Sequence, residues 1–162
     1  MKLARVTYDL QVNVDASKTW EILSHYGDVA EHHSIVIDSK LLSENPHGVG
    51  ADRWCQLPDR IQVWERIVDW NEGSSYTYEV YKWKNFPLKS MFTTFRVESL
   101  GSEKARLSQV VDFRLSPGFL TGLMTGRLRK GVRDTLLAYK HVMETGERDA
   151  SLKVLRKTYK QI

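Results

Sequence analysis

Hydrophobic and polar residues alternate along the first part of the chain and again through its middle. Residues 3–14 alternate with a period of two, which is typical of a strand with one buried face. Between residues 35 and 116 the alternation recurs in segments that end at Gly, Pro, Asn or Asp, with short connections suited to antiparallel neighbours. The pattern predicts strands at 35–43, 51–57, 61–71, 75–84, 88–100 and 105–115.

Four other segments have a helical period or the signals of a helical turn. Asp15 is suited to cap a short helix that Gly27 is expected to end, and a second helical turn is expected over 28–33. After Pro117, apolar residues recur every three or four positions for about seven turns, and Gly146 is a suitable C-cap. Residues 147–162 are polar with a weak helical stripe and are expected to form a loosely attached tail.

The order of these elements predicts an α+β fold, with one domain at 1–146 and a basic C-terminal tail, with helical character, at 147–162. A long helix with one apolar stripe must bury it, and alternating strands offer the matching face. A long sheet coils because strands twist, so it is expected to wrap around the helix. A curved sheet and a helix cannot touch everywhere, so we expect an apolar cavity between them.

Composition narrows the class of protein. The 162 residues are 41% hydrophobic and 27% charged, as in ordinary globular domains, and no apolar run approaches the ~20 residues of a membrane span. The alternating N-terminus lacks the apolar block of a signal peptide, so a cytoplasmic location is expected. Cys55 is the only cysteine, which excludes an internal disulfide and leaves no thiolate partners for a metal.

The net charge of +4 arises partly from the C-terminal third. Its basic residues are Arg127, Arg129, Lys130, Arg133, Lys153, Arg156, Lys157 and Lys160. The favoured interpretation is a solvated helix face followed by a basic tail, and no nucleic-acid partner is expected. The alternative is peripheral contact with an anionic membrane.

A local signature adds to this picture. It runs from Gly48-Val-Gly-Ala-Asp-Arg53 through Cys55-Gln-Leu57 and Asp59 to Glu65-Arg-Ile and Tyr76-Thr-Tyr-Glu-Val80. Together with the order of elements, over about residues 3–145, it resembles the START-like helix-grip superfamily (SRPBCC), in its polyketide cyclase/dehydrase and lipid-transport branch. One departure is Arg60, where many members have Gly.

The resemblance implies a helix-grip fold, in which a seven-stranded curved antiparallel sheet wraps around a long C-terminal helix, with two short helices after the first strand. It also implies a hydrophobic cavity. Various relatives bind lipids, sterols, plant hormones or polyketide intermediates, and some catalyse aromatic ring closure.

Alternation and the resemblance together assign one face of each strand to the cavity. The expected ligand-binding residues are Val63, Glu65, Ile67, Tyr76, Tyr78, Val80, Met91, Thr93, Phe95, Gln109, Val111 and Phe113, with Leu120, Met124 and Leu128 from the long helix. For Tyr76 and Tyr78 the alternative is ordinary core packing. Trp64, Trp70 and Trp83 do not fit the alternation, which indicates either packing at strand ends or a register error of one residue.

Glu65 is the sharpest candidate for catalysis, and a cavity tyrosine is the alternative group for proton transfer. A carboxylate buried among apolar groups has a raised pKa and can act as an acid or base near neutral pH. The competing interpretation, which we favour, is a structural ion pair with Arg53 on the neighbouring strand.

Other chemistry is disfavoured. Adjacent His32 and His33 diverge on a helix or a strand, and no acidic partner completes a metal site, so we expect neither a metal nor a cofactor. The nucleotide motifs G-x-x-x-x-G-K-[ST] and G-x-G-x-x-G and the hydrolase motif G-x-S-x-G are all missing. Glycines in the long helix, including Gly131, give close packing or room for a ligand.

The sequence favours a protein that binds a small hydrophobic or amphipathic ligand, such as a lipid, polyketide or isoprenoid-like molecule, without catalysis. The first alternative is an aromatase/cyclase-type enzyme acting on a polyketide-like substrate. The second is a membrane- or partner-interaction protein that uses the basic helix face and tail. The sequence does not distinguish a monomer from a homodimer.

Overall fold

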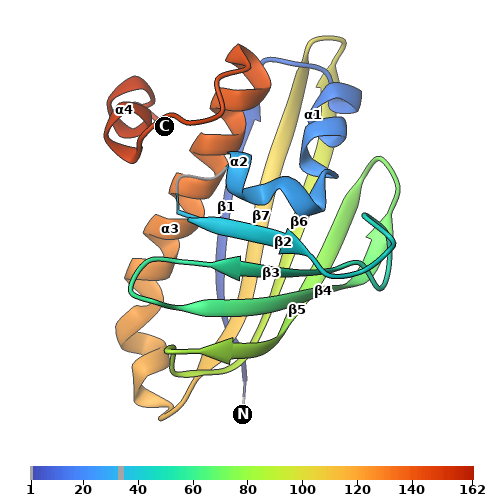
Figure 1. The fold of residues 1–162 in the computed structure, drawn as a ribbon. Coiled ribbons are helices and arrows are strands. Elements are labelled where there is room, and N and C mark those ends of the chain that lie inside the picture. The colour runs from blue at the N-terminus through green and yellow to red at the C-terminus, as the bar shows by residue number, and fades with distance from the viewer. Residues whose placement is uncertain (1, 33–34) are drawn as a thin grey trace.

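The strands form one antiparallel sheet that curls around a long helix (Figure 1). The computed structural model describes residues 2–32 and 35–162. The seven strands lie in the order β1-β7-β6-β5-β4-β3-β2. They are β1 (Ala4–Val12), β2 (Asp38–Leu41), β3 (Asp52–Gln56), β4 (Gln62–Asn71), β5 (Ser75–Lys84), β6 (Leu88–Gly101) and β7 (Lys104–Leu115). The predicted α+β fold with a seven-stranded sheet is confirmed.

The helices occupy the concave side of the sheet and one end of it (Figure 1). They are α1 (Ala16–Leu23), the 3-10 turn η1 (Tyr26–Asp28), α2 (Val29–His32), α3 (Phe119–Thr145) and α4 (Leu152–Thr158). The long helix α3 packs against β1 and β7, and α1 packs against β6 and β7. Leu136 of α3 and Phe113 of β7 are both fully buried, which places the core between helix and sheet.

Two of the three expected helix caps are present. The Asp15 carboxylate accepts a hydrogen bond from the Lys18 backbone N–H at 2.7 Å. Gly146 adopts a left-handed φ of 78°, and its N–H donates to the Val142 carbonyl at 2.9 Å. The expectation for Gly27 is wrong, because α1 ends at Leu23 and the chain tightens into η1, which buries Tyr26 in the core.

Two irregularities between β4 and β5 explain the tryptophans that break the alternation. The pairing shifts by one residue between Trp64 and Glu65, and again between Ile67 and Asp69. The extra residue is Tyr81 of β5 at the first shift and Val68 of β4 at the second. Each shift moves the rest of the strand that carries the extra residue to the other face of the sheet. Trp70 therefore reaches the inner side, where its ring lies 5.5 Å from that of Tyr76.

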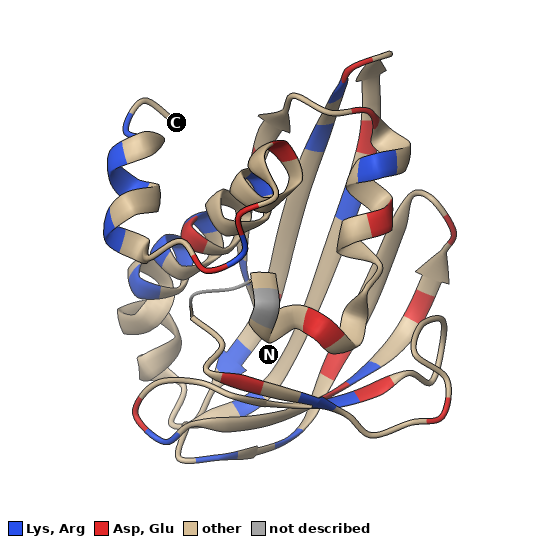
Figure 2. Ribbon diagram, turned by 45° about the horizontal axis from the view of Figure 1, so that its top comes forward, with Lys and Arg blue, Asp and Glu red and all other residues tan. Residues whose placement is uncertain are grey.

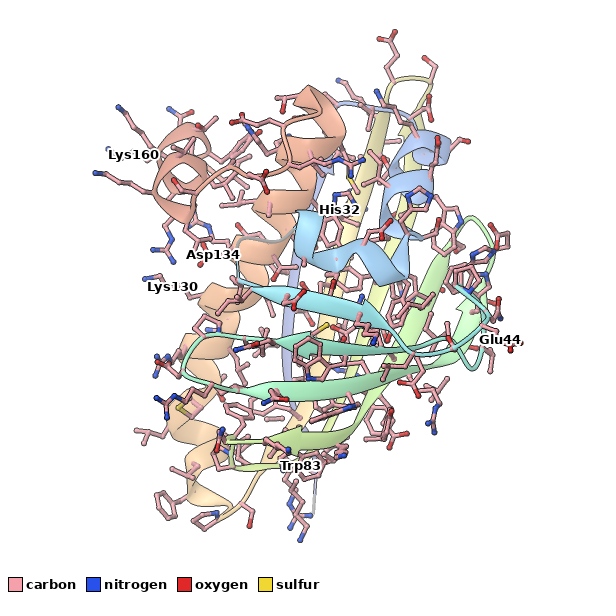
Figure 3. The ribbon with its side chains drawn as sticks, viewed as in Figure 1. His32, Glu44, Trp83, Lys130, Asp134 and Lys160 are labelled. Atoms are coloured by element: carbon pink, nitrogen blue, oxygen red, sulfur yellow. The ribbon has the colours of Figure 1, made fainter. Side chains whose placement is uncertain are left out.

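The other two tryptophans lie on opposite faces. Trp83 packs against the core and pairs with Val63, near the end of β5 (Figure 3). Trp64 stays outside, beneath the Lys82 ammonium at 4.4 Å.

The C-terminal residues are docked on α3 rather than loosely attached. Helix α4 lies on the side of α3 that faces away from the sheet (Figure 1). Leu155 is fully buried, and the Arg156 guanidinium donates to the Asp134 carboxylate at 2.6 and 3.1 Å. The weak apolar stripe understated this attachment because polar contacts supply much of it, including a bond of 2.9 Å between the His141 ring and the Tyr159 hydroxyl.

The turn between β3 and β4 carries a residue under backbone strain. Asp59 and Arg60 have φ values of 62° and 60°, and the Ile61 N–H donates to the Pro58 carbonyl at 3.3 Å, as in a type I′ turn. A left-handed conformation favours glycine over a residue with a Cβ.

Arg60→Gly is expected to raise the free energy of unfolding by about 1 kcal/mol, because glycine removes the strain at this φ. Urea denaturation measures the change. Arg60→Ala is the control, since it removes the charge and keeps the Cβ. An equal gain in both variants would contradict the backbone explanation.

Candidate functional site

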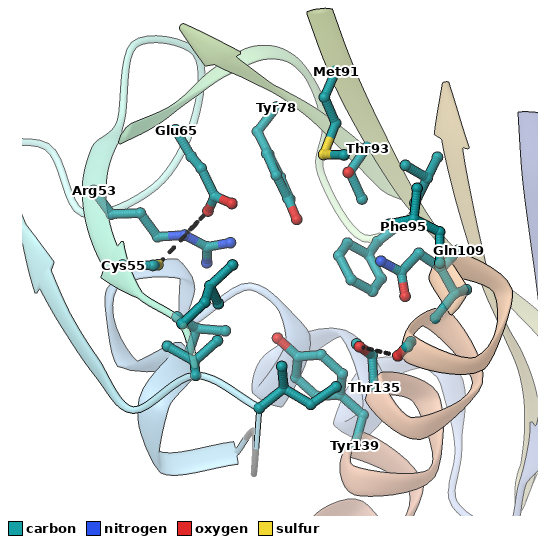
Figure 4. A pocket seen from close by; sticks show the side chains of 18 residues that line it. Arg53, Cys55, Glu65, Tyr78, Met91, Thr93, Phe95, Gln109, Thr135 and Tyr139 are labelled. Atoms are coloured by element: carbon teal, nitrogen blue, oxygen red, sulfur yellow. Dashed lines mark hydrogen bonds and ion pairs between the residues drawn. The ribbon is translucent and has the colours of Figure 1, made fainter. Parts of the chain in front are cut away.

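A cavity of about 180 Å³ lies between the inner face of the sheet and the middle of α3 (Figure 4). Its walls are mostly apolar, with a few polar side chains. Its lining residues are Val29, Ile35, Val36, Arg53, Cys55, Leu57, Glu65, Tyr78, Met91, Thr93, Phe95, Gln109, Val111, Leu128, Gly131, Val132, Thr135 and Tyr139. The sheet contributes β3 to β7, and the chain around α2 closes one side.

About half of the residues expected to bind a ligand line this cavity. They are Glu65, Tyr78, Met91, Thr93, Phe95, Gln109, Val111 and Leu128. Seven others do not: Val63, Ile67, Tyr76, Val80, Phe113, Leu120 and Met124. The five strand residues among these seven are buried in packed core, and the two helix residues lie on the first turns of α3, beyond the cavity. The strand side chains do point to the inner side of the sheet as predicted, but only those near the middle of the inner face border the cavity.

Several lining residues were not among those expected. Arg53, Cys55 and Leu57 come from β3 and its end, where the alternation is as clear as on the other strands. Val132 and Tyr139 come from the apolar stripe of α3. Ile35 and Val36 begin the predicted strand 35–43, and Val29 lies in the predicted helical turn, but adjacent apolar residues and a single turn do not define which side chain faces inward.

One end of the cavity holds a buried ion pair. The Arg53 Nε donates to Glu65 Oε2 at 2.6 Å, and Arg53 Nη1 donates to the Tyr26 carbonyl at 2.7 Å. The two side chains are 4% and 9% exposed, and they meet because Arg53 and Glu65 pair directly across β3 and β4. The structural ion pair that we favoured is therefore present, and the carboxylate is not isolated among apolar groups.

The positive charge on Arg53 has further partners. Its guanidinium carbon lies 3.9 Å from the centre of the Tyr26 ring and 5.0 Å from that of Tyr78. Burial is the largest single influence and lowers the pKa of Arg53, but the Glu65 carboxylate, with smaller contributions from Tyr26, Cys55 and Tyr78, holds this pKa well above its usual value. Arg53 and Glu65 thus form a pair with no net charge in the wall.

Tyrosine hydroxyls line the same part of the cavity. Burial raises the pKa of Tyr139 to about 12 and moves the pKa of Tyr78 still further above its usual value. Both phenols therefore stay protonated at neutral pH, so each retains a hydrogen that it can donate. In Figure 4 both hydroxyls point towards the space between sheet and helix.

Gln109 supplies the polar group at the other end of the cavity (Figure 4). The residue is 6% exposed and projects from the middle of β7, where it pairs with Phe95 of β6. Its Oε1 atom is buried and accepts no hydrogen bond from the described residues. A buried carbonyl oxygen without a donor is uncommon in folded proteins.

Cys55 also faces the cavity, with its sulfur 3.8 Å from Glu65 Oε2. Burial, helped by the Glu65 carboxylate, raises the pKa of its thiol from 9.0 to about 12. At pH 8 the thiolate fraction therefore falls about a thousandfold relative to a free cysteine, since the fraction drops tenfold for each pH unit below the pKa.

At pH 8 the Cys55 thiol is expected to react with iodoacetamide at least about a thousandfold more slowly in the folded protein than in the urea-unfolded protein. Mass spectrometry of timed samples measures both rates. Comparable rates in the two states would contradict the placement of Cys55 in the wall.

Within residues 2–32 and 35–162, no three His, Cys, Asp or Glu side chains are grouped so that they could hold a metal ion. His32 is buried with its ring 6.0 Å from that of Tyr139, whereas His33 lies outside the described residues. No helix of the described chain is both long and apolar enough to cross a membrane.

The architecture and cavity define a helix-grip protein, and the comparison with known families agrees. The sequence model described as "Polyketide cyclase / dehydrase and lipid transport" matches residues 4–144, so the chain belongs to this family. The resemblance inferred from the signature is confirmed. No curated protein matches the chain by sequence.

Solved structures share the fold at low sequence identity. An aromatase/cyclase, Zhui, from a Streptomyces species is similar with a TM-score of 0.71 and 14% identity, over 89% of this chain and 98% of that one. Norcoclaurine synthase from Thalictrum flavum, solved with dopamine and hydroxybenzaldehyde, is similar with a TM-score of 0.66 and 14% identity, over 88% of each chain. A START superfamily protein from Mycobacterium smegmatis is similar with a TM-score of 0.67 and 12% identity, over 82% of this chain and 93% of that one.

Proposed function

We propose that the protein binds a small, neutral, mostly apolar molecule in the cavity between its sheet and α3. The observation that carries the proposal is a cavity of about 180 Å³ with mostly apolar walls in an otherwise packed core. Because Arg53 and Glu65 neutralise each other, the wall offers no unbalanced charge for an ion. Sparse polar groups in an apolar site are typical of sites that orient a ligand.

The volume limits the size of the ligand. An apolar cavity of roughly 150 Å³ can hold benzene, whereas sites for drug-sized molecules measure roughly 300–1,000 Å³. At about 180 Å³ the cavity suits one ring or a short branched chain, and it is too small for a whole lipid. The norcoclaurine synthase structure with two single-ring compounds supports this size class.

Native mass spectrometry of the purified protein, followed by calorimetric titration with single-ring compounds, tests the proposal. We expect a retained small molecule or saturable binding at one site per chain. If no mass is retained and no single-ring compound binds saturably, the proposal fails.

An aromatase/cyclase-type activity is the second candidate, because the Glu65 carboxylate lines the cavity beside two protonated tyrosines. In that case Glu65→Gln should abolish turnover of a short ketone substrate that fits the cavity and leave its affinity within a few-fold. Unchanged turnover in Glu65→Gln would exclude Glu65 as the acid or base.

A basic surface suggests membrane contact as a further role. Phe119 and Leu123 are 73% and 74% exposed on one face of α3, and Arg127 and Lys130 follow on that face. Lys and Arg continue along α3 and α4 in Figure 2, and Lys130 and Lys160 project outwards in Figure 3. Apolar side chains flanked by cations are typical of peripheral binding to anionic lipid.

Flotation with vesicles of phosphatidylcholine and phosphatidylglycerol tests this role. Phe119→Ser/Leu123→Ser should abolish binding, whereas Leu42→Ser, an exposed residue elsewhere, should not. Equal flotation of both variants would refute contact through α3.

A further inference from the structure

Gln109 carries more information about the ligand than any other lining residue. Its buried Oε1 can only accept a hydrogen bond, and no described residue donates one. Leaving such an oxygen without a donor destabilises the folded state by about the cost of removing it from water. The amide therefore needs a partner that enters the cavity.

No described side chain around Gln109 donates to its Oε1 atom. Phe95 pairs with it on one neighbouring strand, and Tyr8 pairs with it on the other but donates its hydroxyl hydrogen to the Ile162 carbonyl at 3.0 Å. Thr135 also lines the cavity, but it donates to the Gly131 carbonyl at 2.8 Å. The ion pair of Arg53 and Glu65 lies at the opposite end of the cavity (Figure 4).

The partner must bring a donor without a charge. An ammonium group would be buried with no free carboxylate, because Glu65 is already paired with Arg53. A carboxylate would place negative charge against the Gln109 oxygen. A neutral hydroxyl avoids both penalties, since it can donate to Oε1 and accept from the Nε2 of the same amide.

We propose that Gln109 determines ligand specificity by accepting a hydrogen bond from the hydroxyl of a single-ring ligand, of the phenol or cyclic alcohol class. The ring occupies the apolar part of the cavity, between β6, β7 and α3. This inference rests on the proposed function and names the chemical class that the same site selects.

Phenol and toluene test the inference because they have nearly the same shape and differ in the hydroxyl. Isothermal titration calorimetry gives the dissociation constants of both for the wild-type protein, Gln109→Leu and Thr94→Val. Thr94→Val is the control, because it removes a hydroxyl from the neighbouring strand β6 outside the cavity, where it bonds to the Thr77 hydroxyl at 2.8 Å.

In Gln109→Leu the dissociation constant of phenol divided by that of toluene should rise about tenfold or more, because the phenol hydroxyl loses its hydrogen-bond acceptor. In Thr94→Val the ratio should change less than about threefold. If Gln109→Leu does not fold, Gln109→Met serves in its place, because it is unbranched and of similar length.

The outcomes separate this inference from the proposed function. If both ligands bind and the ratio is unchanged in Gln109→Leu, or if it shifts equally in Thr94→Val, the role of Gln109 is overturned while cavity binding stands. If neither phenol nor toluene binds to the wild-type protein, both proposals fail.

Discussion

Arg53→Met is expected to lower the free energy of unfolding by about 3–5 kcal/mol, because it leaves the Glu65 carboxylate buried without its cation. The double variant Arg53→Met/Glu65→Leu is expected to recover most of this loss, since apolar side chains of similar volume can replace a buried pair at little cost. Urea denaturation, with the slope checked for constancy, measures all three proteins.

The same two strands supply a matched control. Asp52 and Arg66 pair one position away from Arg53 and Glu65 but on the outer face, where the Arg66 side chain is 49% exposed. Arg66→Met should cost less than about 1 kcal/mol, because the pair is solvated and Tyr81 still donates to Asp52 at 2.8 Å. Equal losses in Arg53→Met and Arg66→Met would contradict the burial of the inner pair.

Gly131→Leu is expected to abolish ligand binding while it stabilises the fold. Gly131 lines the cavity, and a Cβ at this position would meet no atom within 4 Å. A leucine gains about 1 kcal/mol of helix propensity and further stability from its burial, so the free energy of unfolding should rise by about 1–3 kcal/mol. Its side chain occupies the space that a ring needs, so calorimetry with toluene should detect no binding.

Gly126→Leu is the control for helix propensity, because Gly126 lies on an exposed part of α3 outside the cavity. It should give only the propensity gain of about 1 kcal/mol and leave toluene binding unchanged. If Gly131→Leu still binds toluene as tightly as Gly126→Leu does, the ligand does not occupy the cavity described above.

Alternation and turn residues were sufficient to predict the sheet. Every predicted strand is present, and β5 has the predicted bounds of 75–84. The largest difference is β2, which covers Asp38–Leu41 instead of 35–43, because the edge strand has only β3 as a partner. The long helix and its glycine cap followed directly from the period of apolar residues.

The candidate site was predictable only in part. Alternation divided each strand into two faces, and the family resemblance assigned the face with Glu65 and Gln109 to the interior. Pairing of neighbouring strands suggested Arg53 as the partner of Glu65. Whether an inner residue meets open space or packed core depends on where α3 lies, which no local pattern records. The shifts between β4 and β5 are also invisible in the sequence, although Trp70 was a sign of them.

The central claim is that a ligand occupies the cavity between the sheet and α3, and methyl NMR during a phenol titration tests it most directly. Met91, Val111 and Val132 line the cavity, whereas Leu155 of α4 is buried against α3 and lies outside the cavity wall. We predict saturable shift changes at the three cavity methyl groups and none at Leu155. Saturable binding that leaves the three cavity methyl groups unshifted, or no binding at all, would contradict the account.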